Sequence, residues 1–311
     1  MVFHIFPYDR VHYKWDNRLT PVIHIHPGDT VVYNLREVSD GQITPTSTAK
    51  VLNTIDWNRI YPLSGPIQVE EAVPGDALEV EILDVHSQGW GWSAIIPNFG
   101  LLQDEFRDPK LKIWDLSTGD YAYFREDIKI PLDPFCGTMG VAPANAGRME
   151  VMPPGKFGGN LDVRHLTQGA KLCLPVGVNG ALFSVGDPHA AQGDGEVCVT
   201  GIEASMYVSL RFNLQKKAEL DAPRFIAPGP LTSKYDAAGY YVTLGINSDL
   251  MKAAQAATRQ MVEYISNTWN MAKWEAYMLS SIVVDLKINE VVDQPNWLVG
   301  AYLPLSIFES S

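Results

Sequence analysis

The sequence predicts a mainly β protein with a smaller mixed α/β part near its C-terminal end. In roughly the first two-thirds of the chain, Pro and Gly separate short alternating apolar runs, which is typical of sandwiches and barrels. Apolar residues at helical spacing appear late, after residue 249. We therefore expect a β-rich body over residues 1–215 that carries the functional site, and a mixed α/β part over residues 216–311 packed on it.

Pro-Gly pairs mark the start of two expected strands. Pro27-Gly28-Asp29 precedes Thr30–Leu35, and Pro74-Gly75-Asp76 precedes Ala77–Val85. Pro presets φ and Gly accepts a positive φ, so the pair suits the central positions of a type II turn. Each turn is expected to lead into a strand.

The clearest strand pattern runs from Val197 to Phe212. Apolar residues alternate there with polar ones such as Glu203, which predicts one buried face and one wetter face that includes Glu203. Extending the pattern backwards places Glu196 at the rim of the buried face, beside Cys198. An acid at such a rim is well placed to face a cleft.

The late helical pattern consists of apolar residues three or four positions apart: Leu250, Ala254, Ala257, Met261 and Ile265. This spacing predicts an amphipathic helix. A second helix is expected from Asn270 to about Ser280, followed by strands over Val283–Val292 and Leu298–Leu303. No low-complexity linker separates these parts, so the helices are expected to pack on the β body.

The charge of the chain narrows the classes of partner. The net charge is −12, the pI is about 5.0, and no segment is rich in Lys or Arg. Nucleic acid and anionic membrane are therefore poor partners. A small neutral or cationic substrate fits this charge better.

Cysteine usage and hydropathy indicate the compartment. Cys136, Cys173 and Cys198 are an odd, sparse set, which argues against a disulfide framework and for a reducing environment. No apolar run approaches the roughly 18 residues of a membrane helix, and residues 1–10 lack the pattern of a secretory signal. We expect a soluble, cytoplasmic protein.

The densest polar cluster runs from Gly186 to Glu196. Glycines and a proline shape this loop, and its polar residues are Asp187, His189, Gln192, Asp194 and Glu196. A metal needs several O or N ligands that converge from a shaped backbone, and this segment supplies them. The alternative is a solvated Gly/Asp turn.

Two further segments carry polar residues in loops. Asn160 and Asp162 follow a Gly-Gly pair; Asp162 is either a ligand or base, or it hydrogen-bonds its own backbone in a turn. Residues 53–65 mix polar and aromatic side chains, including Trp57 and Tyr61. These form either the wall of a small-molecule pocket or part of the core.

His24 and His26 lie two residues apart in an expected strand and share a face. Paired histidines can bind zinc, but this pair needs a third ligand from elsewhere. Ordinary surface or core histidines are the alternative interpretation.

Several motifs are missing from the sequence. It has no Gly-x-Ser-x-Gly elbow, no Gly-x-Gly-x-x-Gly after a strand, no His-Glu-x-x-His and no Walker-type motif. Nothing near Cys136 lowers its pKa, so a nucleophilic role for this thiol is disfavoured. Water is then the simpler nucleophile for a hydrolase, which favours metal activation.

Four segments resemble the acetamidase/formamidase family, in order and across most of the chain: Leu63–Gly75, Gly140–Pro143, Gly158–Gly169 and Gly180–Glu196. The most specific are Gly-Gly-Asn-Leu-Asp with the following Arg-His-Leu, and Gly-Asp-Pro-His-Ala-Ala-Gln-Gly-Asp-Gly-Glu. Residues 276–292 also resemble the helix and closing strand of the family. Tyr61 precedes Pro62 where the family pattern has His or Asn, a departure that bears on the substrate.

The resemblance implies jelly-roll-like β-sandwich elements with a smaller mixed α/β part. It implies hydrolysis of formamide, acetamide or a similar short amide to a carboxylate and ammonia, with zinc or calcium as the divalent metal. We also expect a homo-oligomer that acts on a small amide, with neither nucleic acid nor membrane as partner.

Our working hypothesis assigns a role to each matching residue. His189, Asp187 and Asp162 bind the metal, and Glu196 or Asp194 moves the proton of the attacking water. The amide is held by Gln192, Asn160 or Tyr61. Two alternatives remain: a hydrolase of a different or larger amide, and a non-catalytic protein that binds a small ligand or metal.

Overall fold

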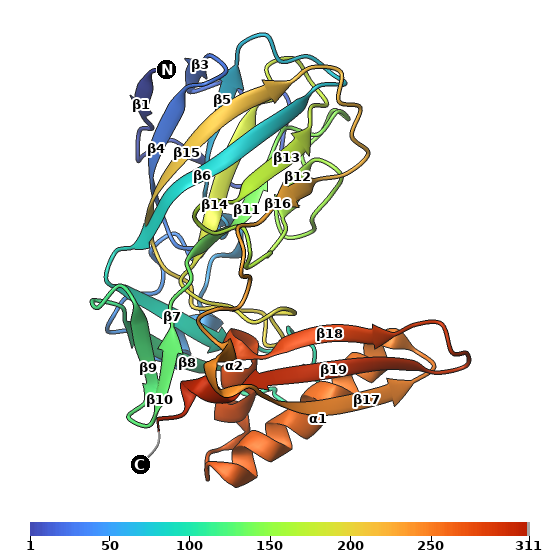
Figure 1. Cartoon of the computed structure of the whole chain (residues 1–311). Helices are drawn as coiled ribbons and strands as arrows, with labels where there is room; N and C mark the ends of the chain where they lie inside the picture. Colours follow the sequence, from blue (N-terminus) through green and yellow to red (C-terminus); the bar gives the residue numbers. More distant parts are fainter. Residues whose placement is uncertain (310–311) are drawn as a thin grey trace.

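The computed structural model describes residues 1–309 and divides visually into an upper β body and a lower α/β part (Figure 1). Strands account for 37% of the chain and helices for 14%, and the strands form several sheets. The predicted fold class, mainly β with a smaller α/β part, is confirmed.

Two six-stranded sheets form the upper body. The first has the order β1 (Phe3–Ile5), β4 (Thr30–Leu35), β15 (Met206–Gln215), β6 (Ala77–Ser87), β13 (Lys171–Pro175) and β16 (Arg224–Ile226). The second has the order β12 (Gly158–Asn160), β11 (Phe135–Gly140), β14 (Phe183–His189), β5 (Leu63–Val69) and β2 (Val11–His12), with β3 (Ile23–Ile25) also on β5. Phe183 of one sheet meets Phe212 of the other edge to face, with ring centroids 5.0 Å apart. The two sheets thus share a buried interior, as in a sandwich.

The lower part combines segments from the middle and the end of the chain (Figure 1). Two hairpins pair β7 (Trp90–Ile95) with β8 (Lys110–Asp115), and β9 (Tyr121–Arg125) with β10 (Ile128–Pro131). A three-stranded sheet has the order β17 (Tyr240–Asn247), β19 (Trp297–Pro304) and β18 (Asp285–Glu290), and it packs with α1 (Leu250–Thr268) and α2 (Lys273–Val283). The boundary proposed between residues 215 and 216 falls just after β15 and stays a prediction.

The strands expected after the two Pro-Gly turns are present. β4 begins at Thr30 and β6 at Ala77, directly after the turns. The strand expected over Val197–Phe212 is partly wrong, because β15 begins only at Met206. Residues before it form two isolated bridges, from Glu203 to Trp92 and from Glu203 to His189. These bridges break the alternation, so Glu203 is 2% exposed instead of lying on a wetter face.

Both predicted helices are present. α1 spans Leu250–Thr268 and buries Ala257, Met261 and Ile265, three of the five residues of the predicted stripe. The second helix begins later than expected, at Lys273. Asn270 has a φ of 46°, which no right-handed helix accepts. Glu275 instead accepts a hydrogen bond from the backbone N–H of Ala272 and fixes the helix start there.

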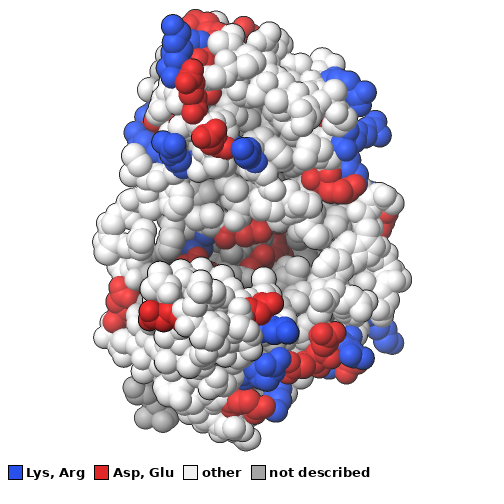
Figure 2. Space-filling model, turned by 90° about the vertical axis from the view of Figure 1, so that its right-hand side faces the viewer, with Lys and Arg blue, Asp and Glu red and all other residues white. Residues whose placement is uncertain are grey.

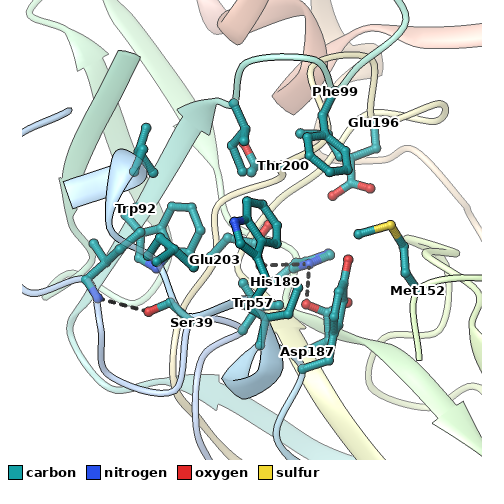
Figure 3. A pocket seen from close by; sticks show the side chains of 18 of the residues that line it. Ser39, Trp57, Trp92, Phe99, Met152, Asp187, His189, Glu196, Thr200 and Glu203 are labelled. Carbon is teal, nitrogen blue, oxygen red and sulfur yellow. Dashed lines mark hydrogen bonds and ion pairs between the residues drawn. The ribbon is translucent and has the colours of Figure 1, made fainter. Parts of the chain in front are cut away.

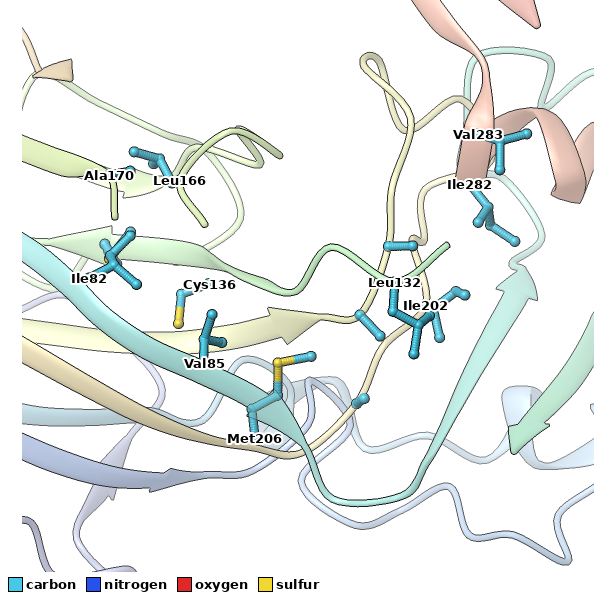
Figure 4. Packing of buried hydrophobic residues seen from close by; sticks show 14 of the residues in the cluster. Ile82, Val85, Leu132, Cys136, Leu166, Ala170, Ile202, Met206, Ile282 and Val283 are labelled. Atoms are coloured by element: carbon cyan, nitrogen blue, oxygen red, sulfur yellow. The ribbon is translucent and has the colours of Figure 1, made fainter. Parts of the chain in front are cut away.

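A continuous apolar core joins the sandwich to the lower part (Figure 4). Ile82, Val85 and Met206 pack inside the sandwich, whereas Ile202 and Ile282 belong to the same cluster where α2 meets the body. The core therefore fixes the loops that run between the two parts.

The three cysteines are free, and Cys136 lies in this core. Burial raises the pKa of the Cys136 thiol to about 12, which makes it a poor nucleophile. Among the described helices, none combines the length and apolar character needed to cross a bilayer.

Candidate active site

A hollow crosses one face of the molecule between the two parts, and acidic side chains lie inside it (Figure 2). The largest group of ionisable residues around one cavity consists of Asp162, Asp187, His189, Glu196 and Glu203. They come from the end of β14 and from the loops after β12 and before β15. The rest of the wall is largely aromatic and aliphatic (Figure 3).

His189 is the centre of the group. Its Nε2 lies 2.9 Å from Oε2 of Glu203 and 3.3 Å from Oδ1 of Asp187 (Figure 3). Burial alone would lower the pKa of His189, but the charges of Glu203 and Asp187 outweigh it and hold the pKa well above its usual value. These two acids therefore favour the protonated, imidazolium form of His189.

Asp162, Glu196 and Glu203 hold protons more tightly than ordinary carboxylates. Burial, with the negative charge of Asp187 next in importance, raises the pKa of Asp162 to about 8. Burial, followed by the charge of Asp162, raises the pKa of Glu196 well above its usual value. Burial raises the pKa of Glu203 to about 7, against the opposing charge of His189. Such shifts are characteristic of functional sites.

The charges in the cavity are not balanced by protein cations. Four carboxylic acids surround one imidazole, and among the described residues no Lys or Arg lines this cavity. Uncompensated charge is costly away from water, so these acids must take up protons or a cation.

Unpaired polar atoms in and beside the cavity match a bound cation. Asp162 Oδ1, His189 Nδ1 and Gln192 Oε1 are buried without a hydrogen-bond partner, and the one close contact of Glu203 Oε2 is with His189. Two sets of possible ligands share His189, one with Asp162 and Glu196 and the other with Asp187 and Glu203. Within each set the ligand atoms lie within 4.8 Å of one another. These groups could hold a divalent metal ion, because imidazole and carboxylate are common ligands of such ions.

Backbone strain is concentrated around the same cavity. Five non-glycine residues that line it have φ between 41° and 78°: Tyr61, Asp162, Asp187, Glu196 and Val199. This conformation is uncommon for bulky or β-branched residues, and it persists where surrounding structure imposes it. The fold thus fixes the backbone at three of the four acids.

A buried ion pair fixes the two acid-bearing loops to the lower part. Arg164 Nη1 lies 2.7 Å from Oδ1 of Asp285, and both side chains are almost fully buried. The same oxygen accepts a hydrogen bond of 3.0 Å from the backbone N–H of Asp194. Arg164 is two residues after Asp162, and Asp194 is two residues before Glu196. Asp285 therefore binds both of the loops that carry these acids.

Five of the residues proposed from the sequence line the cavity: Tyr61, Asp162, Asp187, His189 and Glu196. Gln192 and Asn160 do not line it. Gln192 donates to the backbone oxygen of Asp162 at 2.9 Å, and Asn160 accepts from the hydroxyl of Thr138 at 2.7 Å. Both side chains therefore hydrogen-bond to neighbouring protein groups instead of lining the cavity.

Asp194 and the histidine pair also lie outside the cavity wall. Asp194 is 3.8 Å from His165, and although burial alone would raise its pKa, His165 and Arg164 hold the pKa below its usual value. An acid of this kind is a weak proton acceptor. His24 pairs with Glu70 at 2.8 Å on the surface, so it takes no part in the cavity.

Sequence reasoning missed Glu203, Trp92 and Phe99. Glu203 was assigned to a solvated strand face, and only the break in the strand turns it inward. Trp92 donates its indole N–H to Glu37 at 2.9 Å, and Phe99 stacks on Trp57 with ring centroids 5.4 Å apart. The aromatic content near residues 57 and 61 was the only indication of this wall.

Comparison with known proteins gives a consistent result. A family model described as "Acetamidase/Formamidase family" matches residues 7–151 and 144–310. A formamidase of Methylophilus methylotrophus is 27% identical over 369 residues, covering 96% of this chain and 90% of the relative.

Two solved structures extend the comparison. A gamma lactamase from Delftia acidovorans superposes with a TM-score of 0.91 at 25% identity, covering 100% of this chain and 94% of the other. An acetamidase from Bacillus halodurans gives a TM-score of 0.69 at 31% identity, covering 97% of each chain.

Proposed function

The chain belongs to the acetamidase/formamidase family, and on this premise we propose that it hydrolyses the C–N bond of a short amide to a carboxylate and ammonia. The observation that supports this most strongly is the group of four acids around His189, which has no Lys or Arg among its described lining residues. Hydrolysis by water needs a proton acceptor, a proton donor and stabilisation of a developing oxyanion. This cavity supplies acids for the first two tasks.

His189, Asp187 and Asp162 are the residues we propose as metal ligands. A divalent cation bound there would lower the pKa of water and polarise the amide carbonyl. His189 must lose its proton to become a ligand. The acids nearby must ionise as well, so the raised pKa values of Asp162 and Glu196 predict that cation uptake releases protons. Zinc fits the imidazole among the ligands, and calcium would favour the carboxylates.

Glu196 is the proposed proton carrier. As water attacks the carbonyl carbon, Glu196 accepts one of its protons and forms a carboxylic acid. It then gives this proton to the amide nitrogen as the C–N bond breaks, so that ammonia leaves and a carboxylic acid remains, which becomes a carboxylate as its own proton passes to ammonia or water. A raised pKa suits this role because the acid form is then stable near neutral pH.

Tyr61 is the proposed contact to the amide. It lines the cavity, and burial raises the pKa of its hydroxyl well above the usual value, with the surrounding acids adding to the effect. The phenol therefore keeps its proton and can donate a hydrogen bond to the substrate.

The test is ammonia release from formamide and acetamide. Wild-type protein should release ammonia, and Glu196→Gln should lower kcat by about 10²–10⁴ while retaining the fold. Glu126→Gln, which changes an exposed acid in the same way, is the matched control and should leave kcat unchanged. Wild-type rates in Glu196→Gln would contradict the proposed role of Glu196, and no ammonia from any amide would contradict the function.

A second candidate function is the opening of a cyclic amide. It is favoured by the TM-score of 0.91 to the Delftia gamma lactamase, compared with 0.69 to the Bacillus acetamidase. Ring opening keeps the amine on the product and releases no ammonia. Formation of an amino acid from a γ-lactam, measured by chromatography, distinguishes the two activities.

We further propose that the protein acts in the cytoplasm as a homo-oligomer. The free cysteines support a reducing compartment. Cell fractionation tests the location, and light scattering of the purified protein tests the oligomeric state.

A further inference from the structure

The end of the cavity beyond the acids is almost entirely apolar. Its wall includes Ile43, Leu52, Ile55, Trp57, Trp92 and Phe99. Formamide has no carbon beyond its carbonyl, and acetamide has a single methyl group. Neither would cover a wall of this size.

The few polar groups in this wall are already satisfied by the protein. The hydroxyl of Ser39 donates to Glu37 at 2.7 Å, and the hydroxyl of Thr200 donates to the backbone oxygen of Ala94 at 2.9 Å. The indole N–H of Trp92 is also bonded to Glu37. A ligand in this part of the cavity would therefore meet carbon and engaged polar atoms, which favours an apolar group.

The wall is a fixed structure with its own core. Ile43, Leu52 and Trp92 of the wall form a separate buried cluster together with Ala94. The chain between residues 36 and 59 is also held by Asp40, which pairs with Arg36 at 2.7 Å and with Arg59 at 2.8 Å. A preformed apolar wall binds ligand without first having to be ordered.

The outer side of the cavity is formed by an aromatic pair. Trp57 in the 3-10 helix η2 (Trp57–Arg59) stacks on Phe99 at an interplanar angle of 17°. Trp57 lines the cavity and is 44% exposed, so its ring also contacts solvent. An acyl group that enters the cavity would be covered by these two rings.

The size of the cavity limits the acyl group. Its volume is only about 60 Å³. The amide group takes up part of this space, so an acyl group that the cavity accepts must be compact.

We propose that this apolar end is an acyl-binding subsite, and that the preferred substrates are amides with a compact apolar acyl group larger than that of acetamide. This inference rests on the proposed amidase function and specifies its substrate class. Trp57 and Phe99 are the residues that set the preference, because they cover the group that formamide and acetamide lack.

The test compares kcat/KM for ammonia release across formamide, acetamide, propionamide, butyramide and hexanamide. Each methylene buried in the subsite should raise kcat/KM by about three- to fourfold up to butyramide. The increase should then stop or reverse at hexanamide. In Trp57→Ala and Phe99→Ala, the ratio of kcat/KM for butyramide to that for acetamide should fall by about tenfold.

Tyr207→Ala is the matched control, since it removes an aromatic ring that is 48% exposed and lies outside the cavity. It should leave the ratio unchanged. A kcat/KM that stays level or falls from acetamide to butyramide would overturn the subsite while leaving the amidase function intact. An unchanged ratio in both ring variants would also overturn it. No ammonia from any amide would overturn the proposed function and the subsite together.

Discussion

Glu203 Oε2 lies 2.9 Å from Nε2 of His189, with both side chains 2% exposed or less. This contact joins the end of β14 to the irregular segment before β15. It places a negative charge on the imidazole that we propose as a metal ligand, as carboxylates commonly do beside such histidines.

Glu203→Gln is expected to weaken divalent cation binding by about 10–100-fold, because the amide keeps the shape but loses the charge. Isothermal titration calorimetry with zinc measures this affinity. Glu105→Gln, a surface change, should bind zinc like the wild type. Equal zinc affinity in Glu203→Gln and wild type would contradict the role of the contact.

The ion pair between Arg164 and Asp285 predicts a stability effect. Arg164→Met leaves the buried charge of Asp285 without its ion-pair partner and should lower the free energy of unfolding by about 3–5 kcal/mol. The double variant Arg164→Met/Asp285→Leu should recover much of this loss, because no charge is then stranded. Urea unfolding of both variants checks the prediction. A double variant less stable than the single one would show that the pair itself stabilises the fold.

His12 predicts how stability depends on pH. Burial lowers the pKa of His12 in the folded protein to about 4, against a usual value of 6.5, although the backbone oxygen of Lys14 opposes this shift. The unfolded chain therefore takes up the proton first as the pH falls. The contribution of His12 to the free energy of unfolding is fully present above about pH 6.5 and is lost as the pH falls towards 4. The total loss is on the order of 3 kcal/mol.

His12→Asn removes this titration and keeps an acceptor for the hydroxyl of Ser184, which lies 2.8 Å from Nε2 of His12. The free energy of unfolding, measured at pH 7 and pH 5, should fall less in His12→Asn than in the wild type. The same fall in both proteins would rule out His12 as the cause.

Gly137 makes room for two of the acids. A Cβ at this position would lie 2.5 Å from Oδ1 of Asp162 and 3.0 Å from Oδ2 of Asp187. Gly137→Ala should therefore displace these carboxylates and lower kcat by roughly 10²-fold, as small misplacements at reacting centres do. In Gly229→Ala a Cβ meets nothing within 4 Å, so kcat should be unchanged. Equal kcat in the two variants would contradict the proposed role of the acids.

The sequence predicted the β architecture and much of the acidic site, because both depend on local patterns. Pro-Gly turns placed β4 and β6, and the two polar loops contained Asp162, Asp187, His189 and Glu196. The break in the strand before Met206 depends on bridges to Trp92 and His189, which come from other parts of the chain. No local pattern could therefore reveal that Glu203 is buried in the site.

The apolar wall was only partly predictable for a similar reason. Trp57 was recognised as either pocket or core, but its partner Phe99 comes from a distant loop. Asp194 and Gln192 show the opposite case, since they share the loop of His189 but do not line the cavity. Asp187 and Glu196, which do line it, have positive φ values, and composition does not encode such conformations.

Chelator treatment followed by cation replacement tests most directly whether hydrolysis depends on a cation held by His189 and its acids. Protein dialysed against a chelator and verified as metal-free should release ammonia at less than about one hundredth of the untreated rate, because the acids then retain their protons. Stoichiometric zinc or calcium should restore the rate in the wild type but not in His189→Ala. Full activity in the verified metal-free protein would contradict the metal-assisted mechanism.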